Sequence, residues 1–160
     1  MVISHARVSA DGMVAYSEED LFPAPREVVW RLLTDHLNDA KIVDIHPLIQ
    51  SQKTVGRTGN DVIVDRVIDV NRKLKKSRWK VTYDPPERAR WEVVESEGPW
   101  TVGSFLELTY AEEGKSTRIR AHGEVTVLNL PFFLSQPRVI RKAFNDIQTE
   151  DVWYLRRYRF

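Results

Sequence analysis

The chain of 160 residues contains no cysteine, which excludes disulfide bonds, thiolate nucleophiles and zinc sites with cysteine ligands. It also has no apolar run near the ~20 residues that a membrane-spanning helix needs. The N-terminus lacks a basic region followed by an apolar stretch, so we expect no secretory signal and predict a cytoplasmic protein. The chain also has no large excess of charge of one sign. Its 24 basic and 23 acidic residues give a net charge of +1, which is too little to attract nucleic acid by itself.

Motifs for metal-dependent or covalent chemistry are also missing. The four histidines, His5, His36, His46 and His122, do not show the His-x-x-x-His spacing of a zinc site. There is no Gly-x-Ser-x-Gly turn for a hydrolase nucleophile and no Gly-rich loop before a helix to bind phosphate. We therefore expect neither a metal nor another cofactor.

The composition, with 42% hydrophobic and 29% charged residues, is that of a globular protein. The length favours a single domain over residues 1–160, in which residues 1–12 are expected to form a loose lead-in. Helical periodicity predicts a helix over 25–36, with Pro25 in its first turn, a short helix over 38–45, and a long C-terminal helix from Arg138. The buried face of the first helix is predicted to include Val29, Leu32, Leu33, His36 and Leu37.

Alternation of apolar and polar residues predicts strands around 13–22, 49–57, 61–70, 79–83, 91–93, 100–110 and 119–127. In the first strand, the acidic run Glu18-Glu19-Asp20 favours an edge position or a frayed end. The basic segment 71–76 is expected to form a turn. In the last strand, Arg118, Arg120, His122 and Glu124 are predicted to share a solvated face.

Two segments resemble motifs of the START and birch-pollen-allergen-like superfamily (SRPBCC). Residues 22–35, FPAPREVVWRLLTD, are similar to its first-helix motif. Residues 103–110, followed by Gly114 and residues 117–119, are similar to its hairpin motif, with Phe105 where tryptophan is common. The resemblance spans about residues 13–158. It implies an α+β helix-grip fold: a curved antiparallel sheet of about seven strands, two short helices and a long C-terminal helix packed across the sheet.

The same resemblance implies an apolar cavity between the sheet and the helices. The residues expected to line it and to bind a ligand are Trp79, Val81, Tyr83, Trp91, Val93, Trp100, Val102, Leu106, Leu108, Ala121, Phe144, Ile147 and His46. Aromatic side chains suit this role because they offer wide apolar contact, and Tyr and Trp add one polar group each. For each of these residues plain core packing is the alternative, except for His46, for which it is a solvated loop histidine.

Members of this superfamily include lipid carriers, polyketide cyclases and aromatases, ubiquinone-binding proteins and chaperone activators, so the resemblance leaves the activity open. We expect the protein to bind, or to bind and transport, a hydrophobic small molecule such as a lipid, an isoprenoid quinone or a polyketide-like aromatic. One alternative is a cyclase, aromatase or dehydrase in which His46, Tyr83 or Tyr110 moves protons. Another is a protein-interaction module of the chaperone-activator kind.

A cluster of positive charge suggests a second kind of partner. Between Asn71 and Arg78, five of eight residues are basic: Arg72, Lys73, Lys75, Lys76 and Arg78. These residues could contact an anionic membrane surface, and the alternative is a solvated turn. Nucleic acid is not expected, because no aromatic platform accompanies the basic run. The oligomeric state stays open.

Overall fold

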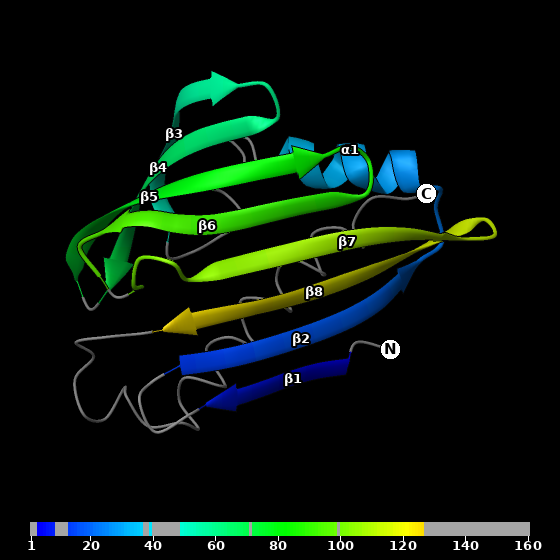
Figure 1. Cartoon of the computed structure of the whole chain (residues 1–160), viewed down its shortest axis with the longest axis horizontal. Coiled ribbons are helices and arrows are strands. Elements are labelled where there is room, and N and C mark those ends of the chain that lie inside the picture. The colour runs from blue at the N-terminus through cyan, green and yellow to red at the C-terminus, as the bar shows by residue number, and fades with distance from the viewer. Residues whose placement is uncertain are drawn as a thin grey trace.

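The computed structural model describes residues 3–8, 13–36, 39, 49–70, 72–98 and 100–126. Within these residues the chain forms one helix and eight strands. In chain order they are β1 (Ile3–Val8), β2 (Met13–Phe22), α1 (Arg26–His36), β3 (Ile49–Thr58), β4 (Asp61–Val70), β5 (Lys73–Asp84), β6 (Arg88–Ser96), β7 (Phe105–Glu113) and β8 (Ser116–Thr126). Figure 1 shows these strands side by side in one sheet, with α1 beside it.

The strands form a single antiparallel sheet in the order β1-β2-β8-β7-β6-β5-β4-β3. From β3 to β8 each strand pairs with the next one along the chain, and the hairpin of β1 and β2 is added beside β8. A bulge interrupts β6 at Val94, because Trp79 of β5 pairs with Val93 while Arg78 pairs with Glu95. Such an extra residue bends a strand and increases its twist, which helps the sheet to curve.

Helix α1 begins where the prolines predicted it. The carbonyl oxygen of Pro25 accepts hydrogen bonds from the amides of Val28 at 3.0 Å and Val29 at 3.1 Å. Proline fits here because the N–H groups in the first turn of a helix have no acceptor within the helix, so the N–H that proline lacks is not needed. Val29 and Trp30 are buried in a core cluster that also contains Tyr110 of β7. The first helix predicted from the sequence is therefore confirmed.

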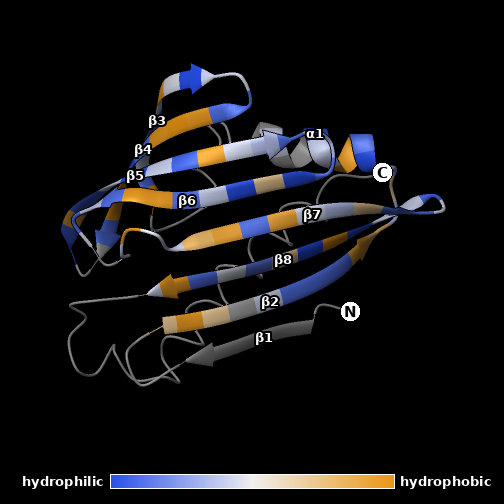
Figure 2. Ribbon diagram, viewed as in Figure 1, coloured by the Kyte–Doolittle hydropathy of each residue, from blue (hydrophilic) through white to orange (hydrophobic). Residues whose placement is uncertain are grey.

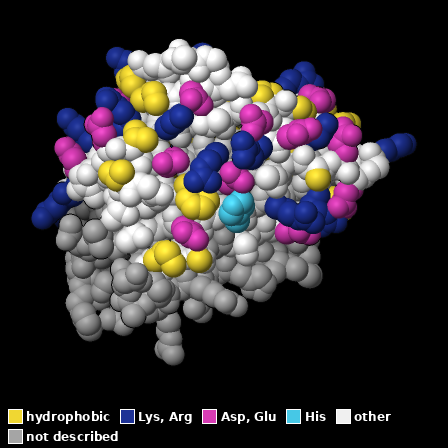
Figure 3. Space-filling view, viewed as in Figure 1, with side chains coloured by type: hydrophobic (Ala, Val, Ile, Leu, Met, Phe, Trp, Pro, Cys, Tyr) yellow, Lys and Arg dark blue, Asp and Glu magenta, His cyan; other side chains and the backbone are white. Residues whose placement is uncertain are grey.

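The two faces of the sheet differ in chemistry. We call the face against which α1 packs the inner face, and the opposite one the outer face. Along the strands hydrophobic and hydrophilic residues alternate, as Figure 2 shows. The outer face carries interspersed acidic and basic side chains (Figure 3). Arg118, Arg120, His122 and Glu124 lie there together, as their alternation in the sequence predicted.

The N-terminal part of the sheet corrects two expectations. Residues 1–12 are not a loose lead-in throughout, because Ile3–Val8 form β1 and pair with β2. This strand brings the sheet to eight strands rather than about seven. It also makes β2 an internal strand between β1 and β8, not the edge or frayed strand that its acidic run favoured.

Two boundaries were also predicted wrongly. The basic segment 71–76 was expected to be a turn, but β5 already begins at Lys73, paired with Val70 of β4. The alternating series from Trp100 was expected to form one strand, but β7 begins only at Phe105. Residues 101–104 form a turn instead, in which Gly103 adopts a φ of 88° that favours glycine.

Some predicted elements lie outside the described residues. These are most of the short helix over 38–45 and the long C-terminal helix from Arg138, together with His46, Phe144 and Ile147. No helix among the described residues is long and apolar enough to cross a membrane.

Candidate ligand-binding face

Most of the residues predicted to line a cavity lie together on the inner face. In one row across the sheet, Val81 pairs with Trp91 and Trp91 with Leu106. In the next row, Leu108 pairs with Ala121. The predicted residues that this face brings together are Trp79, Val81, Tyr83, Trp91, Val93, Leu106, Leu108 and Ala121. Their alternation in sequence was therefore a reliable guide to the face they occupy.

Two predicted lining residues are placed differently. Trp100 lies apart from this row and packs against the buried pair Ile49 and Ile68. Val102, expected on the same strand face, is 64% exposed in the turn before β7. The alternation fails there because residues 101–104 form a turn and not a strand. Whether a residue number is odd or even therefore no longer indicates which face of the sheet its side chain is on.

Three aromatic residues form a cluster where α1 packs on the inner face: Trp30 of α1, Tyr83 of β5 and Tyr110 of β7. Trp30 lies edge-on to Tyr83 at 5.9 Å between ring centroids and to Tyr110 at 5.3 Å. Burial raises the pKa of both phenols, and for Tyr110 the neighbouring Tyr83 adds to the effect. At neutral pH both hydroxyls therefore keep their protons. They can donate hydrogen bonds to a ligand, but they cannot serve as bases.

The inner face also carries a positive charge that the sequence reading did not single out. The guanidinium of Arg66, in β4, lies over the ring of Trp91 at 4.5 Å and that of Trp79 at 5.4 Å. Its Nε donates a hydrogen bond of 2.6 Å to Oε1 of Gln52 in β3. A cation above aromatic rings is stabilised by their negative faces. The arrangement puts a cationic, hydrogen-bonding group beside apolar walls.

A carboxylate from beyond α1 extends this polar network. Asp39 accepts hydrogen bonds from Nε2 of Gln52 at 3.1 Å and from the amide and hydroxyl of Thr54, at 2.7 and 3.1 Å. Burial alone would raise the pKa of Asp39, but these hydrogen bonds and the charge of Arg66 together lower it. Asp39 is thus a stable anion that holds Gln52, and Gln52 in turn orients Arg66.

Two further carboxylates lie on the inner face of β2. Glu18 and Asp20 are 9% and 6% exposed, and in register they lie opposite Ala121 and Ile119 of β8. From the sequence, their acidic run favoured an edge position or a frayed end for this strand. The signal that would have found them is period two: counting back from the buried Phe22 places both side chains on its face.

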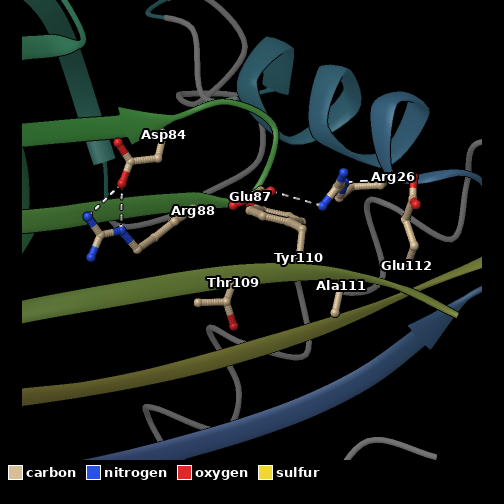
Figure 4. Close-up of a pocket in the computed structure, with 8 residues that line it drawn as sticks. All are labelled: Arg26, Asp84, Glu87, Arg88, Thr109, Tyr110, Ala111 and Glu112. Carbon is tan, nitrogen blue, oxygen red and sulfur yellow. Dashed lines mark hydrogen bonds and ion pairs between the residues drawn. The ribbon is translucent and has the colours of Figure 1, made fainter.

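A separate groove of about 560 Å³ lies where the start of α1 meets β7 and the turn between β5 and β6 (Figure 4). It is lined by Arg26, Asp84, Glu87, Arg88, Thr109, Tyr110, Ala111 and Glu112. Its charged side chains form ion pairs with one another. Nη1 of Arg26 lies 3.5 Å from Oε1 of Glu87, and Nη2 of Arg88 lies 2.6 Å from Oδ2 of Asp84. This charged groove is not the apolar cavity that the sequence analysis expected.

Comparison with known proteins agrees with this arrangement. A family model described as polyketide cyclase/dehydrase and lipid transport matches residues 13–158. No curated protein is a significant sequence match. Similar solved structures include the Zhui aromatase/cyclase from Streptomyces sp. R1128, with a TM-score of 0.69, 13% identity, and coverage of 89% of this chain and 91% of that chain.

Two other solved structures share the fold. A START superfamily protein from Mycobacterium smegmatis has a TM-score of 0.64 and 14% identity over 88% of this chain and 93% of that one. A protein from Thermus thermophilus has a TM-score of 0.63 and 21% identity over 89% of this chain and 92% of that one. The curved antiparallel sheet with a helix on its inner face is that of the START-like, helix-grip proteins. Within them, the chain belongs to the polyketide cyclase/dehydrase and lipid transport family.

Proposed function

We propose that the protein binds a hydrophobic small molecule against the inner face of its sheet, with a polar or anionic group of that molecule directed at Arg66. Suitable ligands are a lipid, an isoprenoid quinone or a polyketide-like aromatic. The observation that carries the proposal is the guanidinium of Arg66 over the rings of Trp79 and Trp91 on an otherwise apolar part of the sheet. The family's description, which names polyketide cyclases and lipid transport, supports it.

In the proposed complex, apolar residues provide affinity for the ligand and one charged group, the guanidinium of Arg66, orients it. Burial of apolar ligand surface against Trp79 and Leu106, which are only partly buried, would supply most of the affinity, at ~25 cal/mol per Å². Arg66 would supply orientation, because a guanidinium donates several hydrogen bonds in a fixed plane. Gln52, which is itself held by the anionic Asp39, fixes the orientation of the guanidinium plane before a ligand binds. This lowers the entropic cost of binding.

Binding is tested with the purified protein and a panel of fatty acids, phospholipids, quinones and aromatic polyketides. Native mass spectrometry detects retained ligands, and quenching of tryptophan fluorescence gives their affinities. The informative variant is Arg66→Met, which keeps the length of the side chain but removes its charge. We expect it to weaken binding of acidic ligands by about 10-fold to 100-fold, the usual worth of a hydrogen bond to a charged group.

Arg90→Met is the matched control. The guanidinium of Arg90 also lies over an aromatic ring, that of Phe105 at 3.9 Å, but on the outer face. This variant should bind ligands as the unchanged protein does. If no member of the panel is retained, the proposed function is wrong and a protein-interaction role gains weight. If both variants lose the same affinity, the ligand does not lie at Arg66.

Catalysis of a cyclisation or dehydration on the same face is the second candidate. It is favoured by two phenols that stay protonated and can donate hydrogen bonds to a carbonyl or enolate oxygen, Tyr83 and Tyr110, within one aromatic cluster. Its test is turnover of a poly-β-ketone substrate by the unchanged protein and by the variants Tyr83→Phe, Tyr110→Phe and His46→Ala. Turnover that survives all three substitutions would remove these residues from the mechanism, and no turnover would leave binding as the function.

A further inference from the structure

The hairpin between β4 and β5 ends in a basic segment that carries an exposed leucine. We call residues 72–76, Arg72-Lys73-Leu74-Lys75-Lys76, the basic tip. Strands β4 and β5 pair as far as Val70 and Lys73, and Arg72 adopts a φ of 62° in the turn between them. Leu74 is 65% exposed, a larger fraction than for the other large hydrophobic residues exposed in the described part of the chain. The tip therefore presents an apolar side chain among cations.

The charges of the basic tip are not neutralised as those of the neighbouring sheet are. Further along β5, Arg78 binds Asp65 at 2.7 Å and Glu95 at 3.1 Å, and Lys80 binds Asp61 at 3.0 Å. In the described part of the chain, Arg72, Lys73, Lys75 and Lys76 form no ion pair with a carboxylate.

Two acidic residues, Glu97 and Asp69, lie beside the basic tip. Glu97 accepts a hydrogen bond from the backbone amide of Lys76 at 3.0 Å, and Asp69 lies opposite Leu74 in the register. The basic tip thus carries four cations with two carboxylates beside it, so it keeps a positive field in a protein whose net charge is only +1.

A second exposed apolar residue lies at the same end of the sheet. Because neighbouring strands are antiparallel, the connection from β6 to β7 lies at the end where β5 begins, as Figure 1 shows. Val102 in this connection is 64% exposed. Trp100, two residues earlier, packs against Ile68, which pairs with Lys75 of the basic tip. The connection is therefore held next to the hairpin.

We propose that the basic tip docks the protein on an anionic lipid surface, with Leu74 inserted among the headgroups. Lysine and arginine near such a surface are attracted by its negative potential, and an exposed leucine gains by leaving water. A nucleic acid would satisfy the cations equally well, but it would leave Leu74 without a partner, since bases stack on aromatic rings. The exposed leucine therefore favours the membrane. The proposal does not depend on the ligand of the inner face.

The first test is co-sedimentation of the full chain with vesicles of phosphatidylcholine alone or of an equal mixture of phosphatidylcholine and phosphatidylserine. We expect binding to the mixed vesicles only, weakening as salt is added. The double variant Lys73→Gln with Lys76→Gln should weaken it by about tenfold or more, from the usual worth of one basic residue near a charged membrane. The matched control is Lys53→Gln with Lys115→Gln, which removes the same charge from exposed lysines elsewhere and should bind as before.

Insertion of the leucine has its own readout, because the protein contains no cysteine. A polarity-sensitive fluorophore attached at Leu74→Cys should shift to shorter wavelength on mixed vesicles. The same fluorophore at Val55→Cys, in β3 and 44% exposed in the unchanged protein, should not. The proposal is overturned if mixed vesicles are not bound, if both lysine variants lose binding equally, or if neither fluorophore shifts. Binding of a single-stranded oligonucleotide through the same lysines, without vesicle binding, would assign the tip to nucleic acid.

Discussion

At Gly123, strands β7 and β8 approach each other too closely for a side chain. A Cβ atom there would collide with the carbonyl oxygen of Phe105 and lie 3.2 Å from Cα of Leu106. Both obstacles are backbone, which cannot move aside as a flexible side chain can. We expect Gly123→Ala to lower the free energy of unfolding by about 1–3 kcal/mol, the usual cost of forcing extra volume into a packed site. Urea denaturation followed by circular dichroism measures the change.

Gly56→Ala provides the comparison within the same sheet. Gly56 lies in β3, its φ is not in the left-handed region, and an added Cβ would meet Cβ of Ile63 at an ordinary 3.8 Å. This substitution should leave stability unchanged or raise it slightly, because alanine restricts the unfolded chain. Equal losses in the two variants would show that the cost at Gly123 is not one of backbone contact.

Among single residues of the candidate site, the aromatic ones were predictable and the charged ones were not. Trp79, Val81 and Tyr83 alternate with polar neighbours, and the structure places all three on the inner face. Arg66 follows the same alternation, after Val62 and Val64, and so lies on that face too. It was missed because burial of a cation is normally costly, and the groups that offset this cost here, among them Gln52, the rings of Trp79 and Trp91 and the charge of Asp39, come from other parts of the chain.

At the scale of elements, β3 lies at an edge of the described sheet and has no partner strand on one side. Asp39 accepts one of the hydrogen bonds that this open edge can donate. The carboxylate accepts the Thr54 amide, a donor that would otherwise face outward from the sheet. Replacing Asp39 with alanine removes three hydrogen bonds at once. We expect Asp39→Ala to destabilise the protein by about 1–2 kcal/mol, because Gln52 is buried while Thr54 remains accessible to water. Urea denaturation gives the value.

Asp84→Ala is a suitable reference for this substitution. It also removes a carboxylate that binds a side chain, but Asp84 and its partner Arg88 are both about half exposed, and water can replace the contact. The denaturation midpoint of this variant should stay within error of the unchanged protein. If Asp39→Ala behaves in the same way, Asp39 does not anchor the edge strand.

Element by element, local patterns predicted α1 and most of the strands, while long-range pairing decided the rest. The short segment Ile3–Val8 carries little pattern of its own, and it is a strand because β2 offers it a partner. Lys73 extends β5 for the same reason, through pairing with Val70. The bulge at Val94 returns Glu95 to the outer face opposite Arg78, a shift of parity that alternation alone does not reveal.

At the scale of the whole molecule, basic side chains on the outer face of the sheet form ion pairs with acidic side chains of neighbouring strands. Arg118 bridges Glu19 of β2 and Glu113 of β7, and Arg78 bridges Asp65 of β4 and Glu95 of β6. Cross-strand pairs of opposite charge favour the native register, since a slip of one residue would move them to the other face. The charge pattern on this face therefore supports the strand order, while most of the core residues lie on the inner face.

The same pairs determine how the stability of the whole protein depends on pH. Hydrogen bonds from Arg120 to Glu19, from Lys80 to Asp61, from Arg78 to Asp65 and from Arg118 to Glu113 lower the pKa of each carboxyl group. A carboxyl whose pKa is lower in the folded state stabilises that state above its unfolded pKa, and this contribution is lost as pH falls through the folded value. The free energy of unfolding should therefore be flat from neutral pH to about 5 and fall below about 4, where unfolded carboxyls take up protons.

Denaturation in urea at a series of pH values checks this, since guanidinium chloride would screen the charges. The informative variant is Arg78→Met combined with Arg118→Met, which removes the cations next to Asp65, Glu19 and Glu113. Without these partners the folded pKa values return toward those of the unfolded chain, so the acid loss should become shallower. An equally steep loss in the variant, or a loss that begins above pH 5 in the unchanged protein, would place the responsible groups elsewhere than in the ion pairs of the outer face.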